Sequence, residues 1–365
     1  MRGVKTFLRR EPVFCAAFLA ALISCFFVPP DSGYLDYIDL RTLALLYCLM
    51  VTVAGLRRAG VFARLSHLLC RQAGTERKLA LLLVLLCFFS AMFVTNDVAL
   101  LTFVPFAVAV LGMTHQEKNL ITVVVLQTIA ANLGSVLLPV GNPQNLYLYS
   151  HYALSMPDFL KMTAPLWGLS LLIVVLLCLR IRPTAVNVFL GELPLLDRRC
   201  LTVYALLFLA CLSVVFRLVE WPVLLLILIL VLLIYDRKRL LAADFMLLLT
   251  FVCFFVFSGN LARIETVDRI LRSVLNGREL PLGAAVSQVI SNVPAALLLS
   301  GFTENAKGLL LGVNIGGLGT PVASLASLIS LKLYSHAQGA DTGKYLRTFL
   351  GLNFALLLLL LLIFR

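Results

Sequence analysis

The chain has 365 residues, of which 61% are hydrophobic and only 13% are charged, and its mean hydropathy is +1.01. Soluble domains average about 45–50% apolar and about 25% charged residues, so this composition excludes a soluble globular protein. The net charge of +12 does not indicate nucleic-acid binding, because Lys and Arg stand in short clusters between apolar runs. The sequence predicts one membrane domain that contacts the lipid bilayer and has no nucleic-acid partner.

The amino-terminal region has the charge pattern of a signal peptide without its processing site. Basic residues precede the apolar run 13–28, but no small-x-small cleavage motif follows. We therefore expect a retained first helix. The nine cysteines form no CxxC pair and lie mostly inside apolar stretches, so we expect reduced, packed thiols.

Several charge-free stretches approach the length of a helix that spans a bilayer, and their flanking residues complete each span. They cover 13–28, 42–56, 162–179, 200–216, 221–235, 245–262 and 348–364. Three other apolar regions, 79–114, 119–150 and 280–331, are interrupted by Asn, Gly or Pro clusters. Such interruptions predict broken helices or hairpins.

The interrupted regions determine the predicted topology. We expect re-entrant hairpins at 79–113 and 280–303 and broken helices at 118–151 and 306–336. The fold class is then an all-α polytopic membrane protein with about nine full crossings plus two re-entrant hairpins. With the N-terminus in the cytoplasm and the C-terminus outside, 21 of the 30 Lys and Arg fall on the cytoplasmic side. This bias follows the positive-inside rule and predicts a multi-pass protein of the cell (inner) membrane.

An internal repeat relates the two halves of the chain. Residues 132–151 match 314–336, and the tip motif at 95–98 corresponds to 291–294. We expect a first repeat at 1–182, a connecting loop with a spare helix at 183–219, and a second repeat at 220–365. The spare helix makes the number of crossings between the copies odd, so the repeats are expected to be inverted. Inverted repeats with paired breaks indicate the binding site of a secondary transporter.

The breaks are the expected binding site. Backbone groups freed by a break need a polar cavity or protein partners, because lipid cannot satisfy them. We expect the second half-helices of the broken regions to restart near Pro143 and Pro321. Their N-termini then point at this cavity, where the helix dipole and free N–H groups favour binding of an anion. The expected substrate-binding residues are Thr95, Asn96, Asn142, Pro143, Gln144, Asn145, Ser291, Asn292, Thr320 and Pro321.

Asp97 is the one acid within the first interrupted region. A carboxylate inside a membrane is a functional hypothesis by default, here as a cation ligand or a proton carrier. It is equally suited to cap the helix that starts at Val98. The residues expected to couple a cation or proton are Asp97, Asn96, Gly141, Asn292 and Gly319. A sodium ion is expected at Asn96, Asp97 and Asn292, and no other cofactor.

Further amides in the interrupted regions are uncharged groups that reach substrate or neighbouring helices. For Gln127 we expect a bond between helices, whereas Gln288 remains a candidate for substrate contact. His115, His151 and His336 lie at the predicted membrane edges and are interpreted as interfacial.

The paired motifs resemble the ion-transporter superfamily. This group includes divalent-anion/sodium symporters, citrate-transporter-like proteins, arsenite permeases and one class of sodium/proton antiporters. The resemblance is carried by the tips 95–97 and 291–293 and by the loops 141–145 and 316–321. Symporters of this type have Ser-Asn-Thr tips that bind sodium and a substrate carboxylate, whereas the third position here is Asp97 in one tip and Val293 in the other. The resemblance also implies a homodimer and an elevator-like movement of the hairpin domain.

The sequence therefore favours a secondary active transporter for a small anion, either a carboxylate or an inorganic oxyanion, coupled to sodium or protons. The alternative is a cation/proton antiporter or an arsenite-type efflux permease that uses Asp97. An enzyme is disfavoured because no His or second acid stands near Asp97 in sequence. A channel is disfavoured because inverted repeats around a midplane site favour alternating access. The chain has no GxxxxGK[ST] motif, so we expect ionic coupling.

Overall fold

A computed structural model describes residues 11–113, 119–186, 192–337 and 339–365. Within these ranges the chain is helical apart from turns, connections and one isolated β-bridge between Thr75 and Ala185. The predicted broken-helix start at 118, His115 and the basic residues before residue 11 lie outside the described residues.

The same series of elements occurs in both halves of the chain. The first half contains α2 (Pro12–Phe27), η1 (Ser32–Tyr37), α3 (Leu40–Arg58), α4 (Val61–Cys70), α5 (Glu76–Val94), α6 (Asn96–Met113), α7 (Leu120–Gly134), η3 (Pro139–Gly141), α8 (Pro143–His151) and α9 (Met156–Leu179). After α10 (Arg198–Val215), the second half contains α11 (Trp221–Tyr235), η4 (Arg237–Leu241), α12 (Phe245–Ala262), α13 (Glu265–Leu275), α14 (Glu279–Ile290), α15 (Asn292–Ser300), α16 (Ala306–Ile315), η5 (Pro321–Ala323), α17 (Leu325–Ser335) and α18 (Thr342–Phe364).

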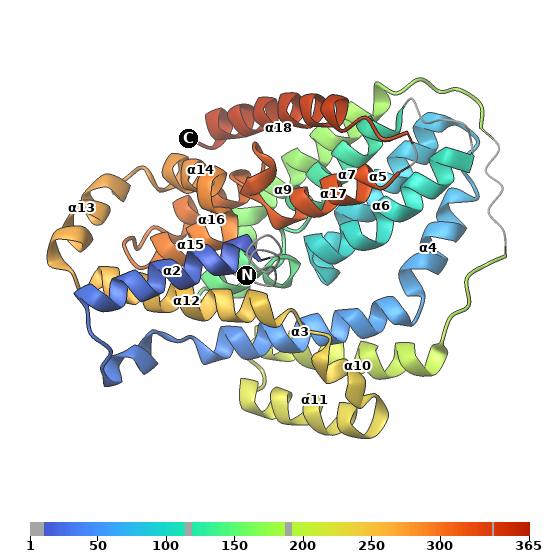
Figure 1. The fold of residues 1–365 in the computed structure, drawn as a ribbon. Coiled ribbons are helices and arrows are strands. Elements are labelled where there is room, and N and C mark those ends of the chain that lie inside the picture. The colour runs from blue at the N-terminus through green and yellow to red at the C-terminus, as the bar shows by residue number, and fades with distance from the viewer. Residues whose placement is uncertain (1–10, 114–118, 187–191, 338) are drawn as a thin grey trace, which may run out of the picture.

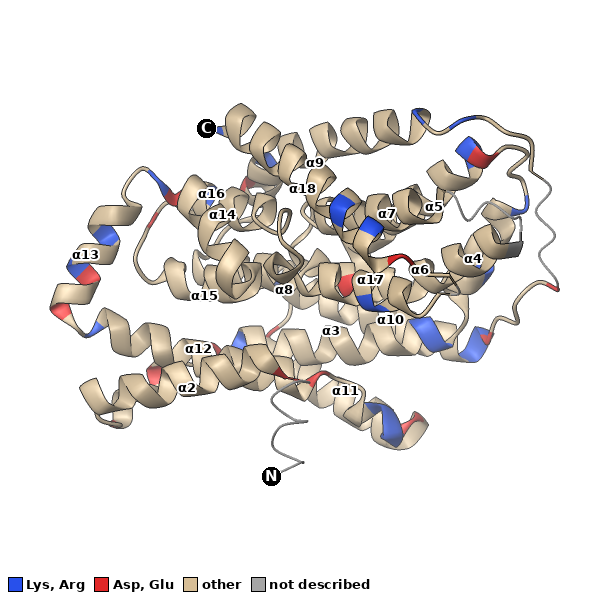
Figure 2. Cartoon of the chain, turned by 45° about the horizontal axis from the view of Figure 1, so that its top comes forward, with Lys and Arg blue, Asp and Glu red and all other residues tan. Residues whose placement is uncertain are grey.

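Among the described residues, six helices are long and apolar enough to cross a membrane: α3, α5, α9, α10, α12 and α18. Figure 2 shows that charged residues gather at helix ends and in connections, while the long helices are largely free of charge. Large apolar side chains face outward, including Phe26 and Ile234, which are 82% and 90% exposed. The protein is thus an all-α polytopic membrane protein. The number of crossings and the inversion of the repeats stay predictions.

Each hairpin turns at a residue with an unusual backbone. Thr95 separates α5 from α6 with φ 70° and ψ 150°, and Ser291 separates α14 from α15 with φ 75° and ψ 154°. Non-glycine residues rarely adopt positive φ, and each such residue costs on the order of 1–3 kcal/mol. The matching geometry ends one helix and starts the next at equivalent places in the two halves.

The hairpins and broken helices lie between two sets of longer helices (Figure 1). On one side, α9 packs on α5 and α7, and α18 packs on α7, α16 and α17. On the other side, α3 packs on α8 and α12 packs on α15, with α2, α10 and α11 behind them. The halves also exchange contacts, because α6 packs against α17 and α15 packs against α8. This exchange brings the breaks of both halves together.

Glycines allow each broken helix to approach its own hairpin closely. A Cβ at Gly134 would stand 2.2 Å from the Phe88 carbonyl oxygen in α5. A Cβ at Gly316 would stand 2.7 Å from Cα of Ala284 in α14. Any larger residue would push the broken helix away from the hairpin, so these two glycines fix the distance between them.

Candidate functional site

The starts of four helices line and partly enclose one small cavity, which we call the enclosed cavity. Asn96 and Asp97 begin α6, Pro143 and Gln144 begin α8, Asn292 and Val293 begin α15, and Ser324 and Leu325 begin α17; Leu247 of α12 closes the wall. The cavity has a volume of about 10 Å³, close to that of one water molecule or a single small ion. Positive helix ends from both halves of the chain therefore converge on one small space.

The two broken helices restart by the same device. In the first, η3 begins at Pro139, Asn142 is extended with φ −157°, and its side chain accepts a hydrogen bond of 2.8 Å from Asn145 N. In the second, η5 begins at Pro321 and Ser324 is extended with φ −145°. The second restart is thus at Leu325 and not beside Pro321 as expected, because Pro321 opens the preceding turn as Pro139 does. Ser324 is the structural counterpart of Asn142.

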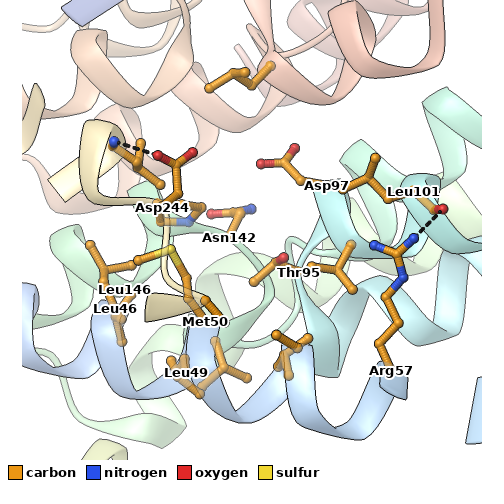
Figure 3. Close-up of a pocket in the computed structure, with 18 of the residues that line it drawn as sticks. Leu46, Leu49, Met50, Arg57, Thr95, Asp97, Leu101, Asn142, Leu146 and Asp244 are labelled. Carbon is orange, nitrogen blue, oxygen red and sulfur yellow. Dashed lines mark hydrogen bonds between the residues drawn. The ribbon is translucent and has the colours of Figure 1, made fainter. Parts of the chain in front are cut away.

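A second, larger cavity of about 570 Å³ adjoins the enclosed one, and Asp97, Pro143, Leu247 and Leu325 line both. We call this larger cavity the vestibule. Most of its wall is apolar, and its polar residues are Arg57, Arg58, Thr95, Asp97, Asn142, Arg239 and Asp244. Figure 3 shows the Asp97 carboxylate directed across the vestibule toward Asn142 and Asp244.

The two carboxylates of the vestibule differ in their partners. Asp244 caps α12, since its side chain accepts a hydrogen bond of 3.0 Å from Leu247 N. The Oδ1 atom of Asp97 is buried and has no hydrogen-bond partner among the residues that the structure describes. A buried acceptor without a partner is costly, so Asp97 has a vacant position for a proton or a cation.

The predicted sodium ligands have suitable chemistry. The Asp97 carboxylate and the amide oxygens of Asn96 and Asn292 are hard oxygen donors of the kind that sodium and other hard cations prefer. Asn96 Oδ1 already accepts a hydrogen bond of 3.0 Å from Asp97 N but keeps a second lone pair. The Asn292 side chain makes no hydrogen bond within the described part of the chain. No cluster of three or more His, Cys, Asp or Glu occurs among those residues.

A buried asparagine in α7 joins the first tip to the second half. Asn132 Oδ1 accepts hydrogen bonds from Asn96 Nδ2 at 3.2 Å and from Ser324 Oγ at 2.9 Å. Its Nδ2 donates to Gly317 O at 3.3 Å and to Ser327 Oγ at 3.4 Å. Asn132 therefore fixes the positions of the first hairpin tip, the loop at Gly317 and the start of α17 relative to one another.

Asn314, the equivalent residue of the other half, holds the start of α8 and, within the described chain, contacts no hairpin tip. Its Nδ2 donates to Asn145 Oδ1 at 2.6 Å, and its Oδ1 accepts a bond of 3.3 Å from Asn142 Nδ2. Asn145 is completely buried, and its Nδ2 donates to Val136 O at 3.1 Å. Asn145 thus supports the loop and faces neither cavity. Asn132 and Asn314 were absent from the predicted site, although both precede a glycine at equivalent places in the repeat.

The predicted residues of the second loop are held by Gln288. Gln288 Nε2 donates to Gly316 O at 2.8 Å and Leu318 O at 3.0 Å, and its Oε1 accepts from Thr320 N at 2.9 Å. Its amide is therefore occupied by the loop, and Gln288 lines neither cavity. Ser291 Oγ donates to Ala323 O at 3.4 Å.

The predicted site residues thus divide into two groups. Thr95, Asn96, Asp97, Asn142, Pro143, Gln144 and Asn292 line one or both cavities. Within the described ranges, Gly141, Asn145, Ser291, Gly319, Thr320 and Pro321 line neither cavity. Gln127 bonds between helices as expected, because its Nε2 donates to Leu83 O and Phe103 O, both at 3.3 Å. It connects both arms of the first hairpin to α7.

Two helical hairpins and two broken helices that meet at a shared cavity define this chain as a polytopic membrane transporter. A family model described as citrate transporter matches residues 8–308, and the chain belongs to this family. It is 32% identical to the inner membrane protein YbiR of Escherichia coli K12 over 336 residues, which cover 89% of this chain and 88% of that protein.

Two other relatives are named as transporters. The uncharacterized transporter MJ0456 of Methanocaldococcus jannaschii is 31% identical over 299 residues, 81% of each chain. The silicon efflux transporter LSI3 of Oryza sativa subsp. japonica is 33% identical over 170 residues, 45% of this chain and 34% of that protein.

Proposed function

We propose that the protein is a secondary active transporter that moves a small anion together with sodium ions or protons. The observation that carries this proposal is the enclosed cavity on which α6, α8, α15 and α17 converge with their N-termini, beside the unpartnered carboxylate of Asp97. Both halves of the chain contribute to the cavity. Leu247 of α12 also lines it, so a shift of the hairpins and broken helices against α12 changes the site.

The anion is proposed to bind in the inner part of the vestibule. Free backbone N–H groups at helix N-termini and the dipoles behind them attract negative charge. Thr95 adds a hydroxyl at the same place, whereas the Asn142 amide nitrogen already donates to Ser135 Oγ and Asn314 Oδ1. The enclosed cavity of about 10 Å³ is too small for a polyatomic anion in this conformation, so it is proposed to hold the coupling ion.

The proposed coupling between the anion and the cation rests on the charges of the carboxylates at the vestibule. An anion entering the vestibule meets the carboxylates of Asp97 and Asp244, which repel it. A proton or sodium ion on Asp97 removes the part of this repulsion that Asp97 exerts, so cation and anion each raise the affinity for the other. Because the linkage is reciprocal, the cation gradient drives uptake of the anion.

Alternating access is proposed to occur by an elevator-like shift of the hairpins and broken helices against α3 and α12 within a homodimer. The contact between these parts is largely apolar around the vestibule, where Leu46, Leu49 and Met50 of α3 face α6 and α8. Apolar surfaces slide at little cost, whereas the hydrogen bond from Arg57 to Leu101 O crosses this contact and would break. Such a shift would expose the cavity to each side of the membrane in turn.

A cation/proton antiporter or an arsenite-type efflux permease is the second candidate. It is favoured by the tip chemistry, because Asp97 supplies a carboxylate at one tip while Val293 supplies no hydroxyl at the other. In this case Asp97 binds the cation and the proton in alternation, and anions do not bind.

Uptake by proteoliposomes tests the proposal. Labelled carboxylates and inorganic oxyanions are offered with an inward sodium gradient, with an inward proton gradient, or with neither. Gradient-driven accumulation of one anion is the expected result. Sodium–proton exchange without movement of any anion would favour the antiporter.

Substitution of one cavity residue tests the proposed location of the site. Asn292→Ala removes an amide that lines the enclosed cavity and makes no other hydrogen bond within the described chain, so transport is expected to be lost while folding is retained. Normal uptake by this variant, and by Asn96→Ala, would contradict the proposed location.

A further inference from the structure

Three arginines stand at the vestibule, and they differ in their partners. Arg58 Nη1 lies 2.5 Å and Arg239 Nε lies 3.5 Å from the same carboxylate oxygen of Asp236. Arg57 has no acidic partner among the described residues, and its Nη2 donates to the carbonyl oxygen of Leu101 at 3.1 Å. Arg57 is therefore the arginine of the three whose charge is not already paired within the described structure.

Arg57 continues an apolar stripe along α3. Residues three or four apart share one face of a helix, and Leu46, Met50 and Val53 occupy such positions on the wall of the vestibule. Arg57 follows Val53 after one further turn. One face of α3 thus presents an apolar strip that ends in a guanidinium group, as Figure 3 shows for Leu46, Met50 and Arg57.

We propose that Arg57 binds the charged head of the transported anion and that this anion is organic, with an apolar chain that lies along Leu46, Met50 and Val53. The inference rests on the proposed function and names the substrate class for it. The head is a carboxylate or sulfonate group, held by Arg57 together with the hydroxyl of Thr95.

The donors needed for such a head are present. A guanidinium group has five N–H donors in a planar fork, and the Leu101 carbonyl occupies one of them. The Thr95 hydroxyl lines the same cavity and makes no hydrogen bond within the part of the chain that the structure describes. A two-oxygen head therefore finds free donors on both α3 and the first hairpin.

The size and surface of the vestibule favour an organic anion over an inorganic one. At about 570 Å³ the vestibule has the volume typical of sites for organic ligands, about 300–1,000 Å³. A hydrated oxyanion would gain nothing from the apolar wall. An alkyl chain gains about fourfold in affinity for every methylene group that it buries there.

Calorimetric titration in lipid nanodiscs tests the inference with sulfate and a series of n-alkyl sulfonates from methanesulfonate to hexanesulfonate. These probes keep their charge at all working pH values. With sodium present, affinity is expected to rise about fourfold per methylene group up to the length of the stripe. Arg57→Gln should lower the affinity for every sulfonate roughly tenfold and leave the dependence on chain length intact.

Control variants distinguish the contribution of the charged head of the ligand from that of its alkyl chain. Val53→Asn should weaken the dependence on chain length, Arg57→Lys should recover part of the affinity, and Lys238→Gln, an exposed charge outside the vestibule, should change neither quantity. Sodium-dependent binding of sulfate but not of the sulfonates would overturn this inference and leave the proposed function intact. Unchanged binding by Arg57→Gln would also overturn it, whereas failure of every anion to bind would remove the proposed function itself.

Discussion

The two hairpin tips share a backbone conformation but differ in their side chains. Thr95 and Ser291 share φ values of 70° and 75°, and each is followed by an asparagine that begins a helix. The next residue is Asp97 in the first tip and Val293 in the second. Thr95 and Asp97 of the first tip line the vestibule. Asn292 and Val293 of the second tip line the enclosed cavity but not the vestibule.

The supports of the tips differ as well. Asn132 contacts the first tip directly through Asn96, while Asn314 bonds to the restart of α8 and not to the second tip. Gln288 instead fixes the loop beside the second tip. The two halves of the chain thus have equivalent helix starts at their hairpin tips, but only the first tip carries a charged residue. We infer that the first tip carries the coupling and that the second completes the site.

The largest effect is expected from Asp97→Asn. This change removes the charge of the first tip and leaves both tips uncharged, so sodium- or proton-driven uptake should fall roughly a hundredfold. Initial uptake rates in proteoliposomes measure it. Glu304→Gln, at an exposed acid outside both cavities, is the control and should retain wild-type rates. Coupled uptake by Asp97→Asn would show that the difference between the tips is not functional.

The two network asparagines provide the next test. Asn132→Ala and Asn314→Ala each leave buried groups without partners, so each should lower the free energy of unfolding by about 2–3 kcal/mol. Asn132→Ala should weaken anion binding more than Asn314→Ala, because Asn132 contacts the first tip, whereas Asn314 acts through the start of α8. Thermal unfolding and calorimetry measure the two effects.

A matched control for that pair is Asn353→Ala. Asn353 is buried in α18, but its Nδ2 bonds within its own helix to Phe349 O at 2.9 Å. Its loss should cost less than about 1 kcal/mol and leave binding unchanged. Equal losses of affinity in Asn132→Ala and Asn314→Ala would contradict the unequal support of the tips.

Gly319→Ala examines the loop beside the second tip. Gly319 has φ 101°, and a Cβ there would stand 2.2 Å from Gln288 Oε1. The strain and the displaced Gln288 should lower the free energy of unfolding by about 2 kcal/mol. Gly351→Ala in α18, where nothing lies within 4 Å, should be neutral or stabilising by roughly 0.5–1 kcal/mol in the same melting experiment. Equal melting temperatures would show that the loop is not held as described.

The smallest effects are expected from the hydroxyls of the tips. Thr95→Ala should raise the KM for the anion a few-fold without changing stability, because this hydroxyl faces the vestibule. Ser291→Ala should cost about 0.5–1 kcal/mol of stability without changing KM, because that hydroxyl bonds to Ala323 O. Thr95→Ser should restore the wild-type KM. A reversed pattern would exchange the roles of the two tips.

The sequence alone predicted much of the fold, because helix breaks leave local signals. Asn292 and Pro143 begin helices where polar residues or proline interrupt apolar runs, and the repeat shows which breaks correspond. The helix α6 begins at Asn96 and not at Val98, so Asp97 lies in its first turn and does not cap it as expected. The restart at Leu325 was misplaced, because Pro321 gives the same local signal at the start of the turn.

The site was less predictable, because its contacts join distant parts of the chain. Asn132 and Ser324 are 192 residues apart, and no local pattern distinguishes a network asparagine from a cap. Arg57 and Asp244 were not among the predicted site residues, because basic and capping residues are common at helix ends. Only the packing of α3 and α12 against the first hairpin places both at the vestibule.

The central claim is that an anion and a cation bind together at Asp97. Calorimetric titration of the anion at several sodium concentrations and pH values, in the wild type and in Asp97→Asn, measures this linkage directly. We predict that the anion affinity of the wild type rises with the concentration of one cation and that Asp97→Asn abolishes this dependence. An anion affinity that is independent of sodium and pH, or a dependence that persists in Asp97→Asn, would contradict the account.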